Sequence, residues 1–428
     1  LGVFFRIDSA RVSGDEIHFT DPNGDQIATG HSVEPGARFR LVFSRSGDML
    51  DFTRGSRETA PGFYPRRSAD APTGLVRPAE DGDGWPTRTP AETGLDEGLL
   101  TKLIGEIATF EPTALRQPYI HSVLIAHQGQ LVVEEYFHGF HKDMPHDSRS
   151  AGKTIGSVLL GIAIEQGFIS SVDAPVYPYF GGVDRFANPD PRKERLTLRH
   201  LVTMSQGFDC NDEDYDTPGN EDVMQSQTEQ TDWYRYILDL AMVGEPGETD
   251  IYCSGGINLI GGVVQEASGM SLPRFFHETF AVPLGITHYH MNLSPTHEGY
   301  LGGGIRLRPR DFLKLGQVYL DGGVWKGQRL VAEDWVEASF AAQASLNAPD
   351  DYGFAWWRRT FEVSGQNIET YYASGNGGQL LFVVPALDLV VQINGGNYSD
   401  GRTRNAFRDR FMREFILPAA MTEKSGAR

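Results

Sequence analysis

The feature that most constrains the fold is the position of the strand-like segments, which lie on both sides of a long helical middle. Ser122–Ala126 and Gln130–Tyr136 are apolar, separated by a short turn, and predict a β-hairpin. Near the other end, Gln379–Val384 and Leu387–Asn394 form a second such pair. Residues 195–340 between them are mainly helical in pattern. We therefore expect an α+β fold whose sheet is antiparallel, built from both ends of the domain and flanked by helices.

Three segments near these strands are predicted to be helices. Asp96–Phe110 has helical periodicity and opens the domain. Ser150–Gln166 is small and aliphatic and is followed by Gly167, which is typical of a buried helix with a glycine stop. The last helix is expected around Thr403–Phe415.

The first 66 residues differ in pattern from the rest of the chain. Short alternating segments, such as Val3–Ile7 and Arg38–Phe43, are separated by turn signals and predict a small antiparallel β module. The following stretch is rich in Pro, Gly, Ala and Asp and has no periodic apolar face, so it is interpreted as a linker. We predict a β module at 1–70, a linker at 71–94 and the main domain at 95–428.

Composition excludes several classes of partner. A net charge of -19 opposes binding to a phosphate backbone, so we expect no nucleic-acid partner. Apolar runs such as Val158–Ile164 are far shorter than the roughly 20 residues that span a bilayer, and we expect no transmembrane segment. The chain begins at Leu1 rather than at a methionine, so its start does not decide whether a secretion signal belongs to the protein.

Ser150-Ala151-Gly152-Lys153 is the first candidate for chemistry, in a chain without a G-x-S-x-G elbow, an H-E-x-x-H motif or a Walker loop. At the start of a helix, Ser150 and Lys153 lie on one face, and free N–H groups favour an oxyanion. A serine nucleophile needs a neighbouring base, and a desolvated lysine can lose its proton near neutrality to serve as one. Alone, S-x-x-K is weak evidence: Ser150 could be a helix cap and Lys153 could extend to solvent.

Two further motifs add weight to the first. Tyr252-Cys253-Ser254 precedes an apolar, glycine-rich helix start, and its tyrosine could carry a proton between nucleophile and leaving group. Alone, Tyr252 could equally be a packed aromatic residue. The stretch 374–379 is glycine-rich and enters an apolar strand, where a backbone N–H could serve as a second oxyanion donor. Alone, this stretch could equally be a β-turn.

Taken in order, the three motifs resemble those of the serine β-lactamase and penicillin-binding-protein superfamily, and specifically its class C-like branch. That branch includes family VIII carboxylesterases and 6-aminohexanoate-dimer hydrolases, and the resemblance extends over about 95–420. It implies that Ser150 is the acylated nucleophile, that Lys153 and Tyr252 handle its proton, and that no metal or organic cofactor is required. It further implies an oxyanion hole made by the backbone N–H groups of Ser150 and Asn376. The implied pocket residues are Ser254, Ser374, Gly375 and Gly377.

Further segments are similar to the same branch: 196–207, 308–316, and Tyr352-Gly353-Phe354 with Trp356-Trp357. Two departures bear on the substrate. The lysine of the K-T-G motif is absent, since Ala373 and Ser374 precede Gly375, and the asparagine of Y-x-N is Ser254. Both changes favour small esters or simple amides over β-lactams and peptide carboxylates. D,D-peptidase or β-lactamase activity stays open as an alternative, as does a ligand sensor without turnover.

The remaining candidates concern metal binding, the acidic loop and the two cysteines. His288 and His290 alternate on one strand face, but no third ligand is near in sequence, so we expect no metal site. The acidic stretch Asp209–Asp222 either forms a solvated surface or borders the pocket. If the fold follows the family, this loop approaches Tyr252, and Cys210 can meet Cys253. A bridge would favour a periplasmic or secreted protein, and free thiols a cytoplasmic one. Oligomeric state is left open.

Overall fold

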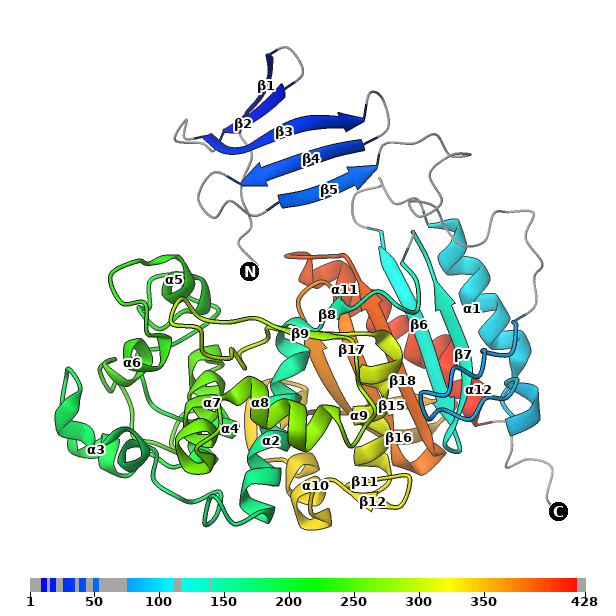
Figure 1. The fold of residues 1–428 in the computed structure, drawn as a ribbon. Helices are drawn as coiled ribbons and strands as arrows, with labels where there is room; N and C mark the ends of the chain where they lie inside the picture. The colour runs from blue at the N-terminus through cyan, green and yellow to red at the C-terminus, as the bar shows by residue number, and fades with distance from the viewer. Residues whose placement is uncertain are drawn as a thin grey trace. The chain divides into compact units, whose positions relative to one another are not determined.

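The computed structural model describes residues 9–13, 16–20, 26–34, 38–43, 49–53, 75–110, 117–138 and 140–421. Backbone contacts divide the chain into two compact units, Leu1–Pro65 and Arg66–Arg428. Both are drawn in Figure 1. Among the described residues, no helix is long and apolar enough to span a membrane.

The first unit contains a five-stranded antiparallel sheet in which each strand pairs with the next in sequence. The segment predicted at Arg38–Phe43 is one of these strands, whereas Val3–Ile7 lies outside the described residues. The strands are β1 (Ser9–Ser13), β2 (Glu16–Thr20), β3 (Gln26–Glu34), β4 (Arg38–Phe43) and β5 (Met49–Thr53).

The second unit is built on an eight-stranded antiparallel sheet in the order β13-β14-β15-β16-β17-β18-β6-β7. Its last two strands in that order come from the start of the unit: β6 pairs with β18, which comes from the end of the unit, and β7 pairs with β6. The prediction of a sheet made from both ends is therefore confirmed. The strands are β6 (Ile120–His127), β7 (Gln130–Tyr136), β13 (Ala344–Asn347), β14 (Asp350–Tyr352), β15 (Trp357–Val363), β16 (Gln366–Gly375), β17 (Gln379–Val384) and β18 (Leu389–Gly395).

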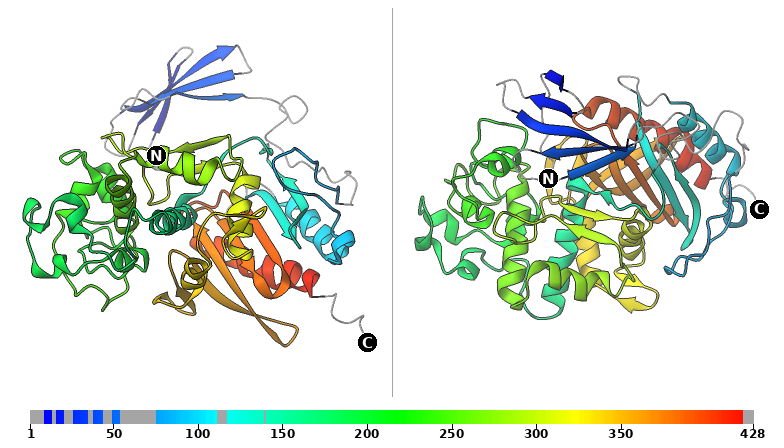
Figure 2. Two further views of the ribbon diagram at one scale, coloured as in Figure 1. Left: turned by 60° about the horizontal axis from the view of Figure 1, so that its bottom comes forward. Right: turned by 45° about the horizontal axis from the view of Figure 1, so that its top comes forward.

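Helices cover both faces of this sheet, because its central strands are apolar on both sides. Along β6, Val123 and Ile125 pack into a core that includes α1, α11 and α12, while Leu124 and Ala126 pack into another that includes α2 and α9. Figure 2 shows the sheet between these helices. The helices are α1 (Glu97–Thr109), α2 (Lys153–Glu165), α9 (Pro309–Leu320), α11 (Gly401–Phe411) and α12 (Leu417–Ala420).

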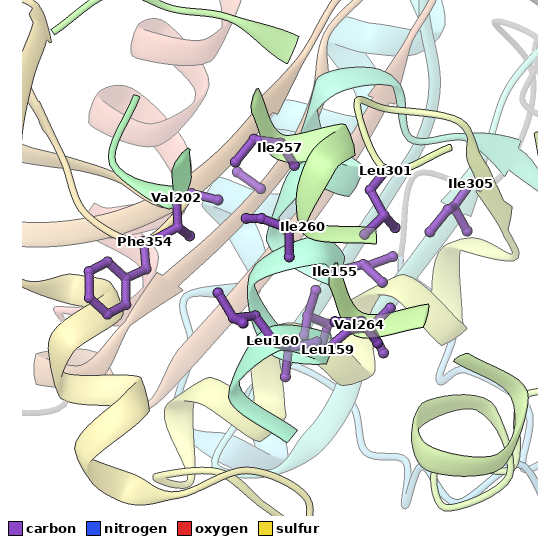
Figure 3. Close-up of a cluster of buried hydrophobic side chains, with 14 of the residues drawn as sticks. Ile155, Leu159, Leu160, Val202, Ile257, Ile260, Val264, Leu301, Ile305 and Phe354 are labelled. Carbon is purple, nitrogen blue, oxygen red and sulfur yellow. The ribbon is translucent and has the colours of Figure 1, made fainter. Parts of the chain in front are cut away.

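A mainly helical region lies beside the sheet, and α2 joins the two parts through its contacts with α7. Glycines allow this close approach: a Cβ at Gly156 would lie 3.2 Å from Ile257 Cγ2. Figure 3 shows the apolar side chains that fill the space between α2 and α7. The helices of this region are α3 (Pro191–Glu194), α4 (Leu198–Val202), α5 (Glu221–Ser226), α6 (Trp233–Leu238), α7 (Ser254–Ser268), α8 (Leu272–Phe276) and α10 (Glu333–Phe340).

Two short sheets complete the second unit. One has the strand order β8-β10-β9 and leads into the Ser150 turn, and the other pairs β11 with β12. The strands are β8 (His146–Asp147), β9 (Tyr289–Met291), β10 (Ile305–Leu307), β11 (Val324–Trp325) and β12 (Gln328–Arg329).

Three segments differ from the sequence expectation. From Leu75 onward the expected linker packs onto the second unit, where Trp85 is buried and its indole N–H donates to the Arg310 carbonyl. The helix expected from Ser150 starts with a 3₁₀ turn, Arg149–Gly152, and becomes α-helical at Lys153. The final helix is α-helical only to Phe411 and continues as a π-turn, Met412–Ile416.

Candidate active site

Ser150 lies on a tight turn between β8 and α2, held between two glycines. The residue before it, Arg149, has φ 48°, a conformation uncommon for residues other than glycine. A Cβ at Gly303 would lie 2.7 Å from the Arg149 carbonyl carbon, and a Cβ at Gly375 would lie 2.5 Å from the Ser148 oxygen. Only glycine fits at these two positions, so the backbone holds Ser150 in one place.

Lys153 is the first residue of α2 and points back toward Ser150. Its Nζ donates to Ser150 Oγ at 2.8 Å and to the Gly302 carbonyl at 2.5 Å. The side chain is only 1% exposed, so Lys153 does not extend to solvent. Two of the three residues expected to be catalytic, the nucleophile and one proton-handling residue, are therefore in direct contact.

The charge of Lys153 differs from the sequence expectation. Burial alone would lower its pKa, but the neighbouring Tyr252, Glu221 and Asp212 outweigh burial and raise the pKa above its usual value. The charges around it thus favour the ammonium form of Lys153, which is not the form that takes a proton from Ser150. The expectation of a lysine deprotonated near neutrality considered burial only, and the compensating acids come from distant parts of the chain.

Tyr252 lies just before α7, with its ring 5.0 Å from Lys153 Nζ. Trp357 stacks on the ring at a centroid distance of 6.1 Å, and Tyr352 meets it edge-on at 6.4 Å. These two aromatic residues come from the segments singled out by resemblance. Their packing places the Tyr252 ring beside the lysine ammonium.

Ser254, expected in the substrate pocket, is fully buried. Its backbone N–H and its hydroxyl both donate to Asp212 Oδ2, at 2.8 and 2.6 Å. The hydroxyl hydrogen is therefore committed to Asp212 rather than offered to a substrate.

Asp212 was not singled out by sequence reasoning, which described the acidic loop only as a solvated surface or a border of the pocket. Burial and the nearby Glu221 carboxylate raise its pKa to about 6. The loop is attached to the Tyr252 segment by a disulfide between Cys210 and Cys253. The signal present in the sequence was the pair of cysteines, since one lies two residues before Asp212 and the other immediately follows Tyr252.

The 374–379 motif lies against the Ser150 turn. β16 ends at Gly375, where a Cβ would also lie 3.0 Å from the Ala151 nitrogen. The next residue, Asn376, accepts a hydrogen bond from the Ser399 N–H through its side chain, at 2.8 Å. Gly377 has φ 93° and faces the Tyr398 ring. Ser374, in register with Leu380 on β17, is half-buried.

Two other features bear on ligands. His290 lies on β9 and His288 just before it, and nowhere in the described residues do three or more His, Cys, Asp or Glu side chains form a group that could hold a metal ion. Arg404, in the first turns of α11, lies within electrostatic reach of Tyr252. Burial and the neighbouring Arg408 lower the pKa of its guanidinium. Sequence reasoning missed this residue because its helix is remote from all three motifs.

Comparison with known proteins finds relatives in the family that the three motifs resemble. The family model described as Beta-lactamase matches residues 121–410. A 6-aminohexanoate-dimer hydrolase from Paenarthrobacter ureafaciens is 25% identical over 317 residues, covering 68% of this chain and 76% of that protein.

Solved structures are similar in fold at lower identity. A candidate 6-aminohexanoate-dimer hydrolase from Bacillus anthracis superimposes with a TM-score of 0.60 at 18% identity, over 72% of this chain and 81% of the other. EstCE1, a hydrolase with promiscuous acyltransferase activity, superimposes with a TM-score of 0.57 at 15% identity, over 78% and 97% of the two chains.

Proposed function

Because the chain belongs to the β-lactamase family and is a hydrolase of that fold, we propose that it is a serine hydrolase working through an acyl-enzyme on small carboxylic esters or simple amides. The observation that carries the proposal is the contact between Lys153 Nζ and Ser150 Oγ at 2.8 Å, with the Tyr252 ring 5.0 Å from the same ammonium. A lysine with only a structural role would not require a serine hydroxyl beside its ammonium, on a turn that two glycines hold in place.

Acylation begins when Ser150 Oγ bonds to the substrate carbonyl carbon. In the proposal Tyr252 reacts as a phenolate, whose charge is balanced by Lys153, and takes the proton from Ser150. The carbonyl oxygen becomes an oxyanion held by the backbone N–H groups of Ser150 and Asn376. Tyr252 then gives its proton to the leaving alcohol or amine as the carbon–oxygen or carbon–nitrogen bond breaks.

Deacylation repeats these steps with water. Tyr252, again a phenolate, takes a proton from the attacking water, and the tetrahedral intermediate collapses to release the acid and Ser150 Oγ. The proton returns from Tyr252 to Ser150. Lys153 keeps its charge throughout, which agrees with its raised pKa.

The ester or amide preference rests on the residues around Gly375. Ala373 stands where the K-T-G motif has its lysine, so no cation at this position can hold a substrate carboxylate, and recognition of penicillins or peptide C-termini is weakened there. The P. ureafaciens relative is named for an amide dimer, and EstCE1 is described as a hydrolase with acyltransferase activity. D,D-peptidase or β-lactamase activity and ligand sensing without turnover are the alternatives.

The proposal is tested by hydrolysis of a short-chain p-nitrophenyl ester, with nitrocefin and a linear 6-aminohexanoate dimer in parallel. We expect ester or amide turnover that Ser150→Ala abolishes, and weaker action on nitrocefin. Ser157→Ala is the matched control, since Ser157 is another buried serine at the start of α2. Turnover that survives in Ser150→Ala would exclude Ser150 as the nucleophile. Turnover of nitrocefin alone would favour β-lactamase activity.

A further inference from the structure

Asp212 bonds the Tyr252 carbonyl through its backbone N–H and Ser254 through its carboxylate. We propose that Asp212 is a positioning residue of this site, which holds Tyr252 and Ser254 in place and supplies negative charge near the Lys153 ammonium. The inference rests on the proposed function. Asp212 touches neither substrate nor Ser150, and it acts through its neighbours.

The hydrogen bonds of Asp212 hold Tyr252 and the residue two positions after it. Its backbone N–H donates to the Tyr252 carbonyl at 3.0 Å, and its Oδ2 accepts from the N–H and the hydroxyl of Ser254. The Ser254 N–H is the first of α7, so the carboxylate also caps the positive end of that helix. The Tyr252 carbonyl and the first residue of α7 are thus both bound to Asp212.

The second oxygen of the Asp212 carboxylate connects the Tyr252 segment to α5. Asp212 Oδ1 accepts from the Glu221 backbone N–H at 3.1 Å, at the start of α5. Two residues away, Cys210 is joined to Cys253, the neighbour of Tyr252. The disulfide beside it and three hydrogen bonds therefore hold Asp212 against the tyrosine segment. A fourth hydrogen bond connects it to α5.

Three charged or titratable groups interact with the carboxylate: Glu221 from α5, Lys153 from α2 and Tyr300 from the loop before β10. The Ser254 hydroxyl donates to it from the first turn of α7. Glu221 in turn bonds the Tyr300 hydroxyl, and Lys153 donates to the carbonyl of Gly302 in the same loop. Glu221 opposes ionisation of Asp212, and Lys153 favours it.

This arrangement predicts when Asp212 changes charge. Burial and the Glu221 carboxylate hold the pKa of Asp212 at about 6, above its usual value of 3.8. Below that pH the protonated carboxyl is a poorer acceptor for Ser254, and it no longer offsets the Lys153 charge. Activity should therefore rise with pH through about 6 as Asp212 ionises.

The test is the pH dependence of kcat/KM for the p-nitrophenyl ester in wild type and Asp212→Asn between pH 5 and 8. We expect the wild type to show an acid limb near pH 6, and Asp212→Asn to be flat, with activity at least about 10-fold below the wild-type plateau. Asp216→Asn is the matched control, because Asp216 is an exposed aspartate in the same loop. Asp216→Asn should keep both the acid limb near pH 6 and the wild-type plateau of kcat/KM.

A second variant keeps the test informative if Asp212→Asn does not fold. Glu221→Gln retains the backbone N–H that bonds Asp212 but removes the repelling charge, so the acid limb should move to lower pH. An unchanged limb in either variant would overturn the inference. Labelling of wild-type Ser150 by a fluorophosphonate distinguishes failure of the proposed function from failure of the inference about Asp212. Absence of labelling contradicts the proposed function. Labelling together with unchanged pH profiles in the variants contradicts only the role of Asp212.

Discussion

The buried pair His121 and His146 predicts that the protein loses stability in mild acid. His121 Nδ1 and His146 Nε2 are 2.8 Å apart, and His146 Nδ1 lies 3.1 Å from the Asp147 carbonyl oxygen. A carbonyl only accepts, so His146 Nδ1 carries a hydrogen, and when both rings are neutral His121 Nδ1 donates to His146 Nε2. Burial favours the neutral form of both rings, since a charged ring would have little contact with water.

The magnitude follows from the pKa values of the two rings. Burial lowers the pKa of His121 to about 2 and that of His146 to about 4, both from 6.5. Unfolded chains therefore bind protons below pH 6.5 that the folded protein does not, and stability falls as the pH drops toward the folded pKa. At pH 5 each ring lowers the free energy of unfolding by about 2 kcal/mol relative to pH 7, and the pair lowers it by about 4 kcal/mol.

Urea unfolding at pH 7 and pH 5 measures this difference. His146→Asn should lose only about half as much free energy of unfolding between the two pH values as the wild type, since one titrating ring remains. His290→Asn is the control, because His290 is exposed on β9. It should show the wild-type loss. The same pH dependence in wild type and His146→Asn would refute the assignment of neutral, buried rings.

Three further predictions address the site and its support. Tyr252→Phe keeps the ring beside Trp357 but removes the hydroxyl, so kcat should fall by roughly 10²–10⁴-fold with an unchanged melting temperature; equal activity would exclude Tyr252 as the proton carrier. Gly303→Ala should reduce ester turnover strongly because its Cβ would meet the Arg149 carbonyl, whereas Gly327→Ala, also at positive φ but with open space around it, should leave turnover intact. Reduction of Cys210–Cys253 by dithiothreitol should lower the free energy of unfolding by about 4 kcal/mol, as expected for a bridge spanning 43 residues, and an unchanged urea midpoint would contradict that.

The sheet could be predicted closely from local pattern. Gln130–Tyr136 and Gln379–Val384 are strands with the expected bounds, because each contains an apolar run, Leu131–Val133 or Leu380–Val384, beside turn residues. Ser150, Lys153 and Tyr252 could be chosen because motif spacing places them at the starts of helices. The structure brings the three side chains together as those motifs require.

Features that depend on distant residues could not be predicted in this way. The charge of Lys153 is set by Asp212, Glu221 and Tyr252, which lie far from it in sequence, and local pattern suggests only that the lysine is buried. Asp212 belongs to an acidic loop whose composition is typical of a surface, and only the fold brings it under Tyr252. Trp85 lies in a stretch with the composition of a linker, yet it finds a buried partner in Arg310, 225 residues away.

The central claim, that Ser150 is the nucleophile of an acyl-enzyme, is tested most directly by mass spectrometry after reaction with a fluorophosphonate. We predict a single adduct on the peptide containing Ser150, absent in Ser150→Ala and present in Ser157→Ala, with loss of ester turnover in proportion to labelling. Folded wild-type protein that hydrolyses the ester but carries no adduct on Ser150, or an adduct on another serine that abolishes turnover, would contradict the account.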